Sequence, residues 1–222
     1  MSIFGDLLDL LLPERCVACG DEPVVLCDGC ATPLRGPARP ASTAPDGLPP
    51  PWTVAAYEGP LRKILPAYKD HGRTALAVPL GEALATSLHK AVADVDPPHT
   101  IVWVPSARAA TKRRGHDPLR ALVAIALQRL REDGVSATAL NALKHRKRVM
   151  DQAGLTATQR TTNLHNALQT TRPDLADRPL ILVDDIITTG ASLSEAARAL
   201  HTAGAKVTAT ATIATTPRHR PP

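Results

Sequence analysis

The sequence predicts an α/β fold with a mainly parallel sheet flanked by helices, preceded by a small module that contains all four cysteines. The first observation is the apolar run Leu180–Asp184, which is followed by an amphipathic segment and a second β-branched run. We expect a helix over Ser192–Ala203, ended by Gly204, and a strand over Ala205–Thr215. Strand, helix and strand without a hairpin turn indicate a right-handed βαβ unit with parallel strands.

The second observation is that the middle of the chain alternates in the same way. Apolar positions at helical spacing predict helices, and short β-branched runs predict strands. In chain order we expect a strand at Trp52–Tyr57, helices at Glu58–Asp70 and Leu76–Val95, a strand at Thr100–Pro105 and a helix at Pro118–Arg131. Pro66 is expected to kink or end the first of these helices. The polar, basic stretch Leu140–Asn166 predicts a loop that runs into a helix, and residues 3–12 a short helix.

Three units are expected along the 222 residues. Residues 1–35 hold the N-terminal helix and the cysteine module, residues 36–51 form a linker, and residues 52–217 form the α/β domain. The linker is rich in Pro, Gly, Ala and Ser and has few apolar side chains with which to pack. Charged residues make up 21% and hydrophobic residues 44%, which is typical of a folded protein. Because aromatics are only 2%, the core must consist of Ala, Val, Leu and Ile.

Membrane insertion and secretion are not expected. The longest uninterrupted apolar runs, such as Ala121–Leu127, fall far short of the roughly 20 residues that a transmembrane helix needs. The N-terminal residues include Asp6 and Asp9 and lack the basic start of a secretory signal. We therefore expect a cytoplasmic protein.

Positive charge gathers between Arg108 and Arg160. That stretch contains 12 Lys and Arg but only 4 Asp and Glu, whereas the whole chain has a net charge of +5. The simplest interpretation is a solvated basic face. The alternative is a surface that binds polyanions, namely phosphates, pyrophosphate or nucleic acid.

The cysteines form two matched pairs, Cys16 with Cys19 and Cys27 with Cys30, in the pattern CxxC–x7–CxxC. A turn within each pair brings two sulfurs to one side, so that one tetrahedral ion can take all four. The alternatives are four unrelated thiols or two disulfides, and a cytoplasmic chain disfavours disulfides. The pattern predicts a structural zinc site, because four thiolates leave no open position for catalysis.

A second motif, Val183–Ser192, predicts a site for a sugar phosphate. The strand ends in two adjacent carboxylates, Asp184 and Asp185, and a short loop then opens a helix. Unpaired N–H groups and the positive dipole end make a helix N-terminus an anion site. The residues expected to hold the phosphate there are Thr188, Thr189, Gly190, Ala191 and Ser192. Carboxylates accept hydrogen bonds from vicinal hydroxyls, so the loop fits a ribose 5-phosphate. The simpler alternative is an acidic strand end followed by an ordinary Ser192 N-cap.

The run VDDIITTGAS resembles the phosphoribosyl pyrophosphate (PRPP) signature of type I phosphoribosyltransferases. The chain as a whole resembles the ComF family, in which a zinc module precedes a phosphoribosyltransferase domain. Besides the cysteine pairs and the PRPP loop, the matching motifs are Tyr57-Glu-Gly-Pro60, Lys69-Asp-His-Gly72, Val104-Pro-Ser106, Arg114-Gly115, and Gln152-Ala-Gly-Leu155 with Arg160 and Asn163. The resemblance implies a type I phosphoribosyltransferase-like parallel sheet.

The resemblance also implies a role for each matching residue. Asp184 and Asp185 would hold the ribose diol and act as catalytic residues together with Arg160. Arg160 would lie in a flexible hood over Lys144–Asn163. The loop that binds pyrophosphate would contain Pro105, Ser106, Ala107 and Arg108. Mg²⁺ would accompany PRPP, and a link to competence would make single-stranded DNA or competence proteins further partners.

Two positions depart from the family pattern. His116-Asp117-Pro118 stands where the family usually has an aromatic residue, Asn and Gln, so any role of that amide is not expected here. Thr188 stands where purine phosphoribosyltransferases carry a carboxylate base, which argues against purine salvage. The sequence therefore predicts a phosphoribosyltransferase with an unknown acceptor. The alternatives are a non-catalytic protein that senses PRPP or a nucleotide and binds nucleic acid, and a structural protein with a decayed site.

Overall fold

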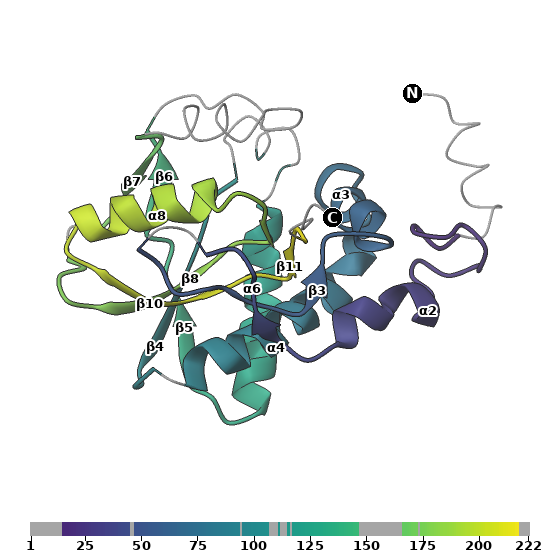
Figure 1. Ribbon diagram of the computed structural model, residues 1–222, viewed down its shortest axis with the longest axis horizontal. Coiled ribbons are helices and arrows are strands. Elements are labelled where there is room, and N and C mark those ends of the chain that lie inside the picture. The colour runs from purple at the N-terminus through teal and green to yellow at the C-terminus, as the bar shows by residue number, and fades with distance from the viewer. Residues whose placement is uncertain are drawn as a thin grey trace, which may run out of the picture.

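A six-stranded sheet forms the centre of the computed structural model (Figure 1). Its order is β1-β2-β10-β8-β4-β5, and the neighbouring pairs are parallel except β1 with β2. The strands are β1 (Arg39–Pro40), β2 (Trp52–Thr53), β4 (His99–Trp103), β5 (Ala137–Ala139), β8 (Pro179–Val183) and β10 (Lys206–Ala211). The structure describes residues 15–44, 47–93, 95–106, 111, 115, 117–146, 166–172 and 174–217. The predicted helix over residues 3–12 lies outside them.

Helices cover both faces of this sheet. α4 (Ala77–Ala93) and α6 (Pro118–Glu132) lie on one face, and α8 (Ala191–Thr202) lies on the other (Figure 1). Side chains alternate along each strand, so Ile181 and Val183 join the core with α4 and α6, whereas Leu180 and Leu182 join the core with α8. The predicted α/β fold with a mostly parallel, helix-flanked sheet is confirmed.

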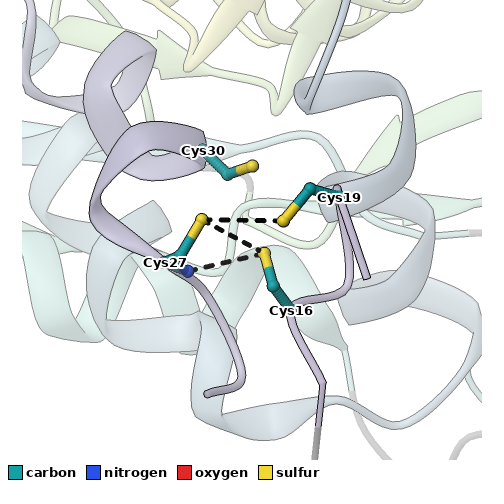
Figure 2. A group of neighbouring side chains, drawn as sticks. All are labelled: Cys16, Cys19, Cys27 and Cys30. Carbon is teal, nitrogen blue, oxygen red and sulfur yellow. Dashed lines mark hydrogen bonds between the residues drawn. The ribbon is translucent and has the colours of Figure 1, made fainter. Parts of the chain in front are cut away.

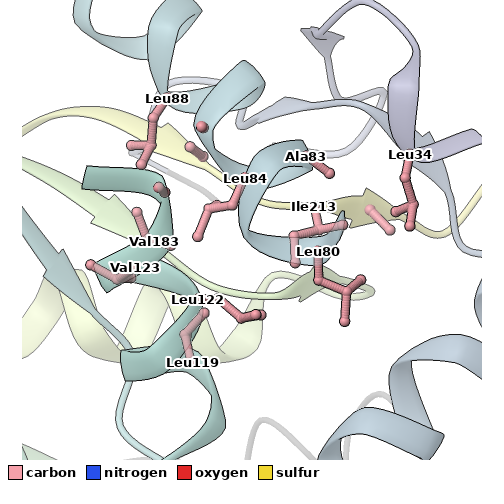
Figure 3. Close-up of a cluster of buried hydrophobic side chains, with 14 of the residues drawn as sticks. Leu34, Leu80, Ala83, Leu84, Leu88, Leu119, Leu122, Val123, Val183 and Ile213 are labelled. Atoms are coloured by element: carbon pink, nitrogen blue, oxygen red, sulfur yellow. The ribbon is translucent and has the colours of Figure 1, made fainter. Parts of the chain in front are cut away.

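The larger core is built mainly from aliphatic side chains, as the composition predicts. Figure 3 shows Leu84 of α4 and Val123 of α6 packed with Val183 of β8. Where α4 crosses α6, a Cβ atom added to Gly81 would lie only 2.6 Å from the Cβ atom of Ile125. Glycine is therefore required at this crossing, since a larger residue would force the two helices apart.

Three neighbouring strands of the sheet break at their carboxyl ends and continue in a second sheet. β2, β10 and β8 are followed by β3 (Ala55–Ala56), β11 (Ala214–Thr215) and β9 (Ile186–Ile187), which pair in the parallel order β3-β11-β9. The strands expected over 52–57 and 205–215 are thus each divided in two. Asp184 and Asp185 occupy the break between β8 and β9. The Asp185 carbonyl oxygen accepts hydrogen bonds from Ile213 and Ala214, at 3.0 and 3.2 Å, which fix the backbone at the break.

The cysteine module packs onto the larger core. It contains α2 (Asp28–Ala31) and the 3₁₀ helix η1 (Thr32–Arg35). Cys16, Cys27 and Leu34 are buried in the same cluster as the apolar side chains of α3 (Leu61–Asp70). Lys63 of α3 also donates a hydrogen bond of 2.6 Å to the Ala18 carbonyl oxygen. The module and the α/β domain therefore share one hydrophobic core.

The Pro-rich segment packs more closely than the sequence predicts. β1 lies within it and pairs with β2, and the Ala41 N–H donates to the Pro51 carbonyl oxygen at 2.7 Å. Ala41 and Leu48 are buried, and Thr210 donates to the Pro49 carbonyl oxygen at 2.9 Å. Backbone pairing and small side chains are enough to attach the segment to the sheet, so the expectation that it could not pack is wrong. Its place as a boundary between units stays a prediction.

Other elements also differ from the prediction. α3 runs through Pro66 to Asp70, because its buried apolar side chains outweigh the one backbone hydrogen bond that proline removes. The 3₁₀ helix η2 (Thr74–Leu76) then leads into α4. The predicted loop contains a strand, β6 (Leu143–His145), which pairs antiparallel with β7 (Leu168–Thr170) just beyond the end of that loop. Among the helices in the described ranges, none is both long and apolar enough to cross a membrane.

Candidate functional site

The loop between β8 and α8 surrounds a hollow of about 240 Å³, a volume that includes space open to solvent. The hollow is lined by Asp184 and by residues 186–193. The residues predicted to hold a phosphate, Thr188–Ser192, are therefore brought together with the first of the two acids. Asp185 lies at the base of this loop.

The start of α8 opens onto the hollow. Gly190 is the N-cap residue, with a φ of 80°, a left-handed conformation that favours glycine. Thr189 Oγ1 accepts a long hydrogen bond of 3.4 Å from the Ala191 N–H. Ser192 lies inside the first turn, so the alternative of an ordinary Ser192 N-cap is wrong. The first backbone N–H groups and the positive end of the helix dipole thus line a polar hollow, as an anion site requires.

The two acids differ in their surroundings. The Asp184 carboxylate accepts a hydrogen bond of 2.9 Å from the Asp185 N–H. Burial, and next the negative charge of Asp185, raise the pKa of Asp184 well above its ordinary value. A carboxyl group with a raised pKa is protonated over a wider pH range, and in its protonated form it can donate as well as accept a hydrogen bond. The pair can therefore both give and take hydrogen bonds with neighbouring hydroxyl groups.

Lys69 of α3 holds the second acid. Its Nζ atom lies 2.5 Å from Asp185 Oδ2, and the two side chains are 31% and 13% exposed. Burial alone would lower the pKa of Lys69, but the charge of Asp185 and the hydrogen bond to it outweigh burial, and the pKa is raised. Lys69 is not among the site residues that the sequence predicts. The motif Lys69-Asp-His-Gly72, which the sequence offers as part of the family resemblance, is the signal that could have identified this lysine.

The loop after β4 leaves the same edge of the sheet. The Val104 N–H donates to the Val183 carbonyl oxygen at 2.9 Å, which carries the parallel pairing past the end of β4. Pro105 and Ser106 therefore lie beside the start of the β8–α8 loop. Ala107 and Arg108 lie outside the described residues, so the pyrophosphate loop stays a prediction.

Asp117 stabilises this second loop. Its carboxylate accepts hydrogen bonds from Ser106 Oγ at 3.0 Å, Trp103 Nε1 at 3.2 Å and the Leu119 N–H at 3.2 Å. It is also the N-cap residue of α6. The departure at His116-Asp117-Pro118 thus places a carboxylate that joins β4, the loop and α6.

The ribbon of β6 and β7 lies against the loop after β4 and against α8. His145 Nε2 lies 3.0 Å from the Pro105 carbonyl oxygen, to which it donates when it carries the proton. On α8, Glu195 accepts a hydrogen bond of 2.9 Å from the Leu168 N–H, and Arg198 donates one of 3.0 Å to the Leu168 carbonyl oxygen. The predicted hood begins at Lys144 in β6, and the rest of it from residue 147 on, including Arg160, lies outside the described residues.

Glu195 is expected to contribute stability that depends on pH. Burial alone would raise its pKa, but hydrogen bonds from Arg198 and the Leu168 N–H outweigh burial and lower it below 4.5. Because the pKa of Glu195 is lowered in the folded state, its ionised carboxylate stabilises the fold above about pH 4.5. This stabilisation is lost as the pH falls through the folded-state pKa. Glu195→Gln should therefore lower the melting temperature at pH 7 more than at pH 3. Equal losses at both pH values, measured by circular dichroism, would contradict this assignment.

The four cysteines converge on one point (Figure 2). Their sulfur atoms all lie within 4.8 Å of one another, and Cys27 Sγ lies 3.6 Å from Cys16 Sγ and 3.8 Å from Cys19 Sγ. A tetrahedral ion with bonds of about 2.3 Å separates its sulfurs by about 3.8 Å. The cysteines are free thiols, so the alternative of two disulfides is wrong. The cluster can hold one metal ion.

The thiol pKa values also fit a metal site. Burial raises the pKa of Cys16, but backbone N–H groups of Cys27 and Cys19 outweigh it and lower the pKa to about 6. Burial and hydrogen bonding with the other cysteines raise the pKa of Cys30 to about 12. Four thiolates this close repel one another unless a cation lies between them, and metal binding is what allows all four to lose their protons.

Comparison with known proteins supports the fold. Residues 120–222 match the family model of the phosphoribosyl transferase domain. A search of curated proteins finds no match. The matched residues include the β8–α8 loop and both acids, whereas the cysteine cluster, Lys69 and the loop at Pro105 precede them. The expected phosphoribosyltransferase-like fold with a preceding four-cysteine cluster is thereby confirmed.

Proposed function

We propose that this chain, which contains a phosphoribosyl transferase domain, binds PRPP in the β8–α8 hollow and transfers its phosphoribosyl group to an acceptor not yet identified. One observation carries the proposal. An acid, two threonines and the first turn of a helix line a single hollow. The acid pair suits the ribose hydroxyls, and the helix end suits the 5-phosphate.

These positions would fix the sugar for displacement at C1. The C1–O bond to pyrophosphate breaks, the acceptor's nucleophile forms the new bond with inversion, and pyrophosphate leaves with the bonding electrons. The negative charge of Asp185 would stabilise positive charge that develops on the ribose ring. The predicted pyrophosphate loop, Pro105–Arg108, follows the neighbouring strand and would face the leaving group. Thr188 offers no carboxylate base, so we propose an acceptor that does not need one.

Two metal ions belong to the proposal. Mg²⁺ prefers carboxylate, phosphate and water oxygens, and we propose that it binds together with the diphosphate of PRPP. Zn²⁺ would take the sulfurs of Cys16, Cys19, Cys27 and Cys30, where a closed set of four thiolates gives it a structural role.

The resemblance to the ComF family extends the proposal. A cytoplasmic location, a link to competence and single-stranded DNA as a partner are proposed on the sequence motifs alone. The basic stretch between Arg108 and Arg160 would contact the DNA phosphates, so that retention on single-stranded DNA should fall steeply as salt rises.

Calorimetry with PRPP and Mg²⁺ tests the proposal directly. The protein should bind PRPP, and ribose 5-phosphate should compete, because both present the diol and the 5-phosphate. Ribose without phosphate should not compete, because it lacks the anion that the helix end binds. Release of pyrophosphate in a screen of acceptors would identify the transfer reaction. Absence of PRPP binding to the folded protein would exclude this function.

A further inference from the structure

Lys69 supplies positive charge to the acid pair from outside the matched domain. It lies on α3, more than one hundred positions before Asp185 in the chain, and the matched residues begin only at 120. Its ammonium group lies 2.5 Å from Asp185 Oδ2. The motif that predicts the sugar-phosphate loop contains no such cation.

Packing fixes where this lysine can reach. The preceding residue, Tyr68, is only 3% exposed, and its hydroxyl donates a hydrogen bond of 2.9 Å to the Pro118 carbonyl oxygen at the start of α6. Ile64 and Leu65 of the same helix are fully buried. Because α3 is held in this register, Lys69 is directed at the break between β8 and β9.

The negative charge of the acids explains why a lysine lies beside them. A carboxylate that is largely withdrawn from water and lies beside a second acid, as Asp185 does, needs a compensating positive charge. A divalent cation is the usual source where phosphorylated sugars bind, and it would compete with the ammonium group for Asp185. An ammonium group has three donors and a carboxylate has about four acceptor sites, so Lys69 can stay on Oδ2 while the other oxygen accepts a ribose hydroxyl.

We propose that Lys69 is the built-in counter-cation of Asp185, which lets the acid pair bind the diol of a ribose phosphate without a metal ion on the acids. The identity of the ligand rests on the proposed function, whereas the exclusion of a divalent cation from Asp185 does not. Mg²⁺ would then serve the diphosphate alone. If the ion pair only ties α3 to the sheet, its removal would change stability but not metal binding.

The first test uses Mn²⁺ alone as a probe of the acids, followed by electron paramagnetic resonance. Mn²⁺ prefers oxygen ligands, so the cysteine cluster should not interfere. Lys69→Met should bind Mn²⁺ about tenfold or more tightly than the wild type, because Asp185 loses its partner. Lys69→Arg and the matched control Lys63→Met, on the same helix but bound to Ala18, should behave as the wild type. Adding Asp185→Asn to Lys69→Met should remove the gain. Equal Mn²⁺ affinity in Lys69→Met and the wild type would overturn the proposal.

The second test is calorimetry with ribose 5-phosphate, with Mg²⁺ or with a chelator. Wild-type affinity should be nearly the same in both conditions. Lys69→Met should lose about tenfold in affinity in the chelator and recover it with Mg²⁺. The same metal dependence in Lys69→Met and the wild type would count against Lys69 while leaving the proposed function intact. A wild type that does not bind ribose 5-phosphate would refute the proposed function, and the Mn²⁺ result would still decide the role of Lys69.

Discussion

Asp184→Asn/Asp185→Asn is expected to weaken PRPP binding by roughly a thousandfold. Each acid offers a ribose hydroxyl a hydrogen bond to a charged or strongly polar group, worth about 2 kcal/mol. Two such bonds correspond to about three orders of magnitude in Kd. Asparagine has the same size as aspartate. At position 184 its side-chain oxygen can still accept the hydrogen bond from the backbone N–H of residue 185, so the break between β8 and β9 should keep its shape. Calorimetry with PRPP and Mg²⁺ measures the effect.

The control is Asp133→Asn/Asp174→Asn, which changes the net charge equally at two exposed positions. It should bind PRPP as the wild type does.

The relative PRPP affinities of the two single variants, Asp184→Asn and Asp185→Asn, are also informative. The Asp184 carboxyl has the raised pKa, so its neutral replacement should cost less affinity than the replacement of Asp185. A double variant that keeps its melting temperature and its PRPP affinity would show that the diol does not bind these acids.

Removal of metal from the cysteine cluster is expected to have the second large effect, a fall in melting temperature of roughly 10–20 °C. The cluster shares the larger core, where Cys16, Cys27 and Leu34 are buried against α3. Without an ion bound to the four sulfurs, the loops that carry them lose their common anchor, and the module should open and expose two or three apolar side chains, at a cost of about 5 kcal/mol. A chelator added under reducing conditions, with unfolding followed by circular dichroism, measures the change.

Three controls accompany this measurement. Reductant without chelator should leave the melting temperature unchanged, because the cysteines are free thiols. Zinc returned after chelation should restore the original value. Mass spectrometry under native conditions should find about one zinc ion per chain. A metal-free, reduced protein that melts at the same temperature as the untreated protein would remove the structural role of the cluster.

The parts of the fold that the sequence predicts best are those with a strong local pattern. The run Leu180–Asp184 and the helix after it were placed to within one residue, because a buried strand and an amphipathic helix each have a clear period. The cysteine spacing likewise predicted a cluster of four sulfurs, which is confirmed. Both signals lie within short stretches of chain.

Other features depend on contacts that the sequence does not reveal. Strands of two or three residues, such as β6 and β7, are too short to show a period, so neither is predicted and β6 falls in a stretch predicted as a loop. The edge strand β1 exists because β2 offers it a partner. The Lys69–Asp185 ion pair joins residues far apart in the chain, and only the packing of Tyr68 against the start of α6 brings them together.

The most direct measurement is a crystal structure of the protein with ribose 5-phosphate, which isolates the central claim from the unknown acceptor. The phosphate should lie against the backbone N–H groups of Thr189–Ser192, with the 2′- and 3′-hydroxyls on Asp184 and Asp185. A sugar phosphate bound elsewhere on the molecule, with the β8–α8 hollow filled only by water, would contradict the account.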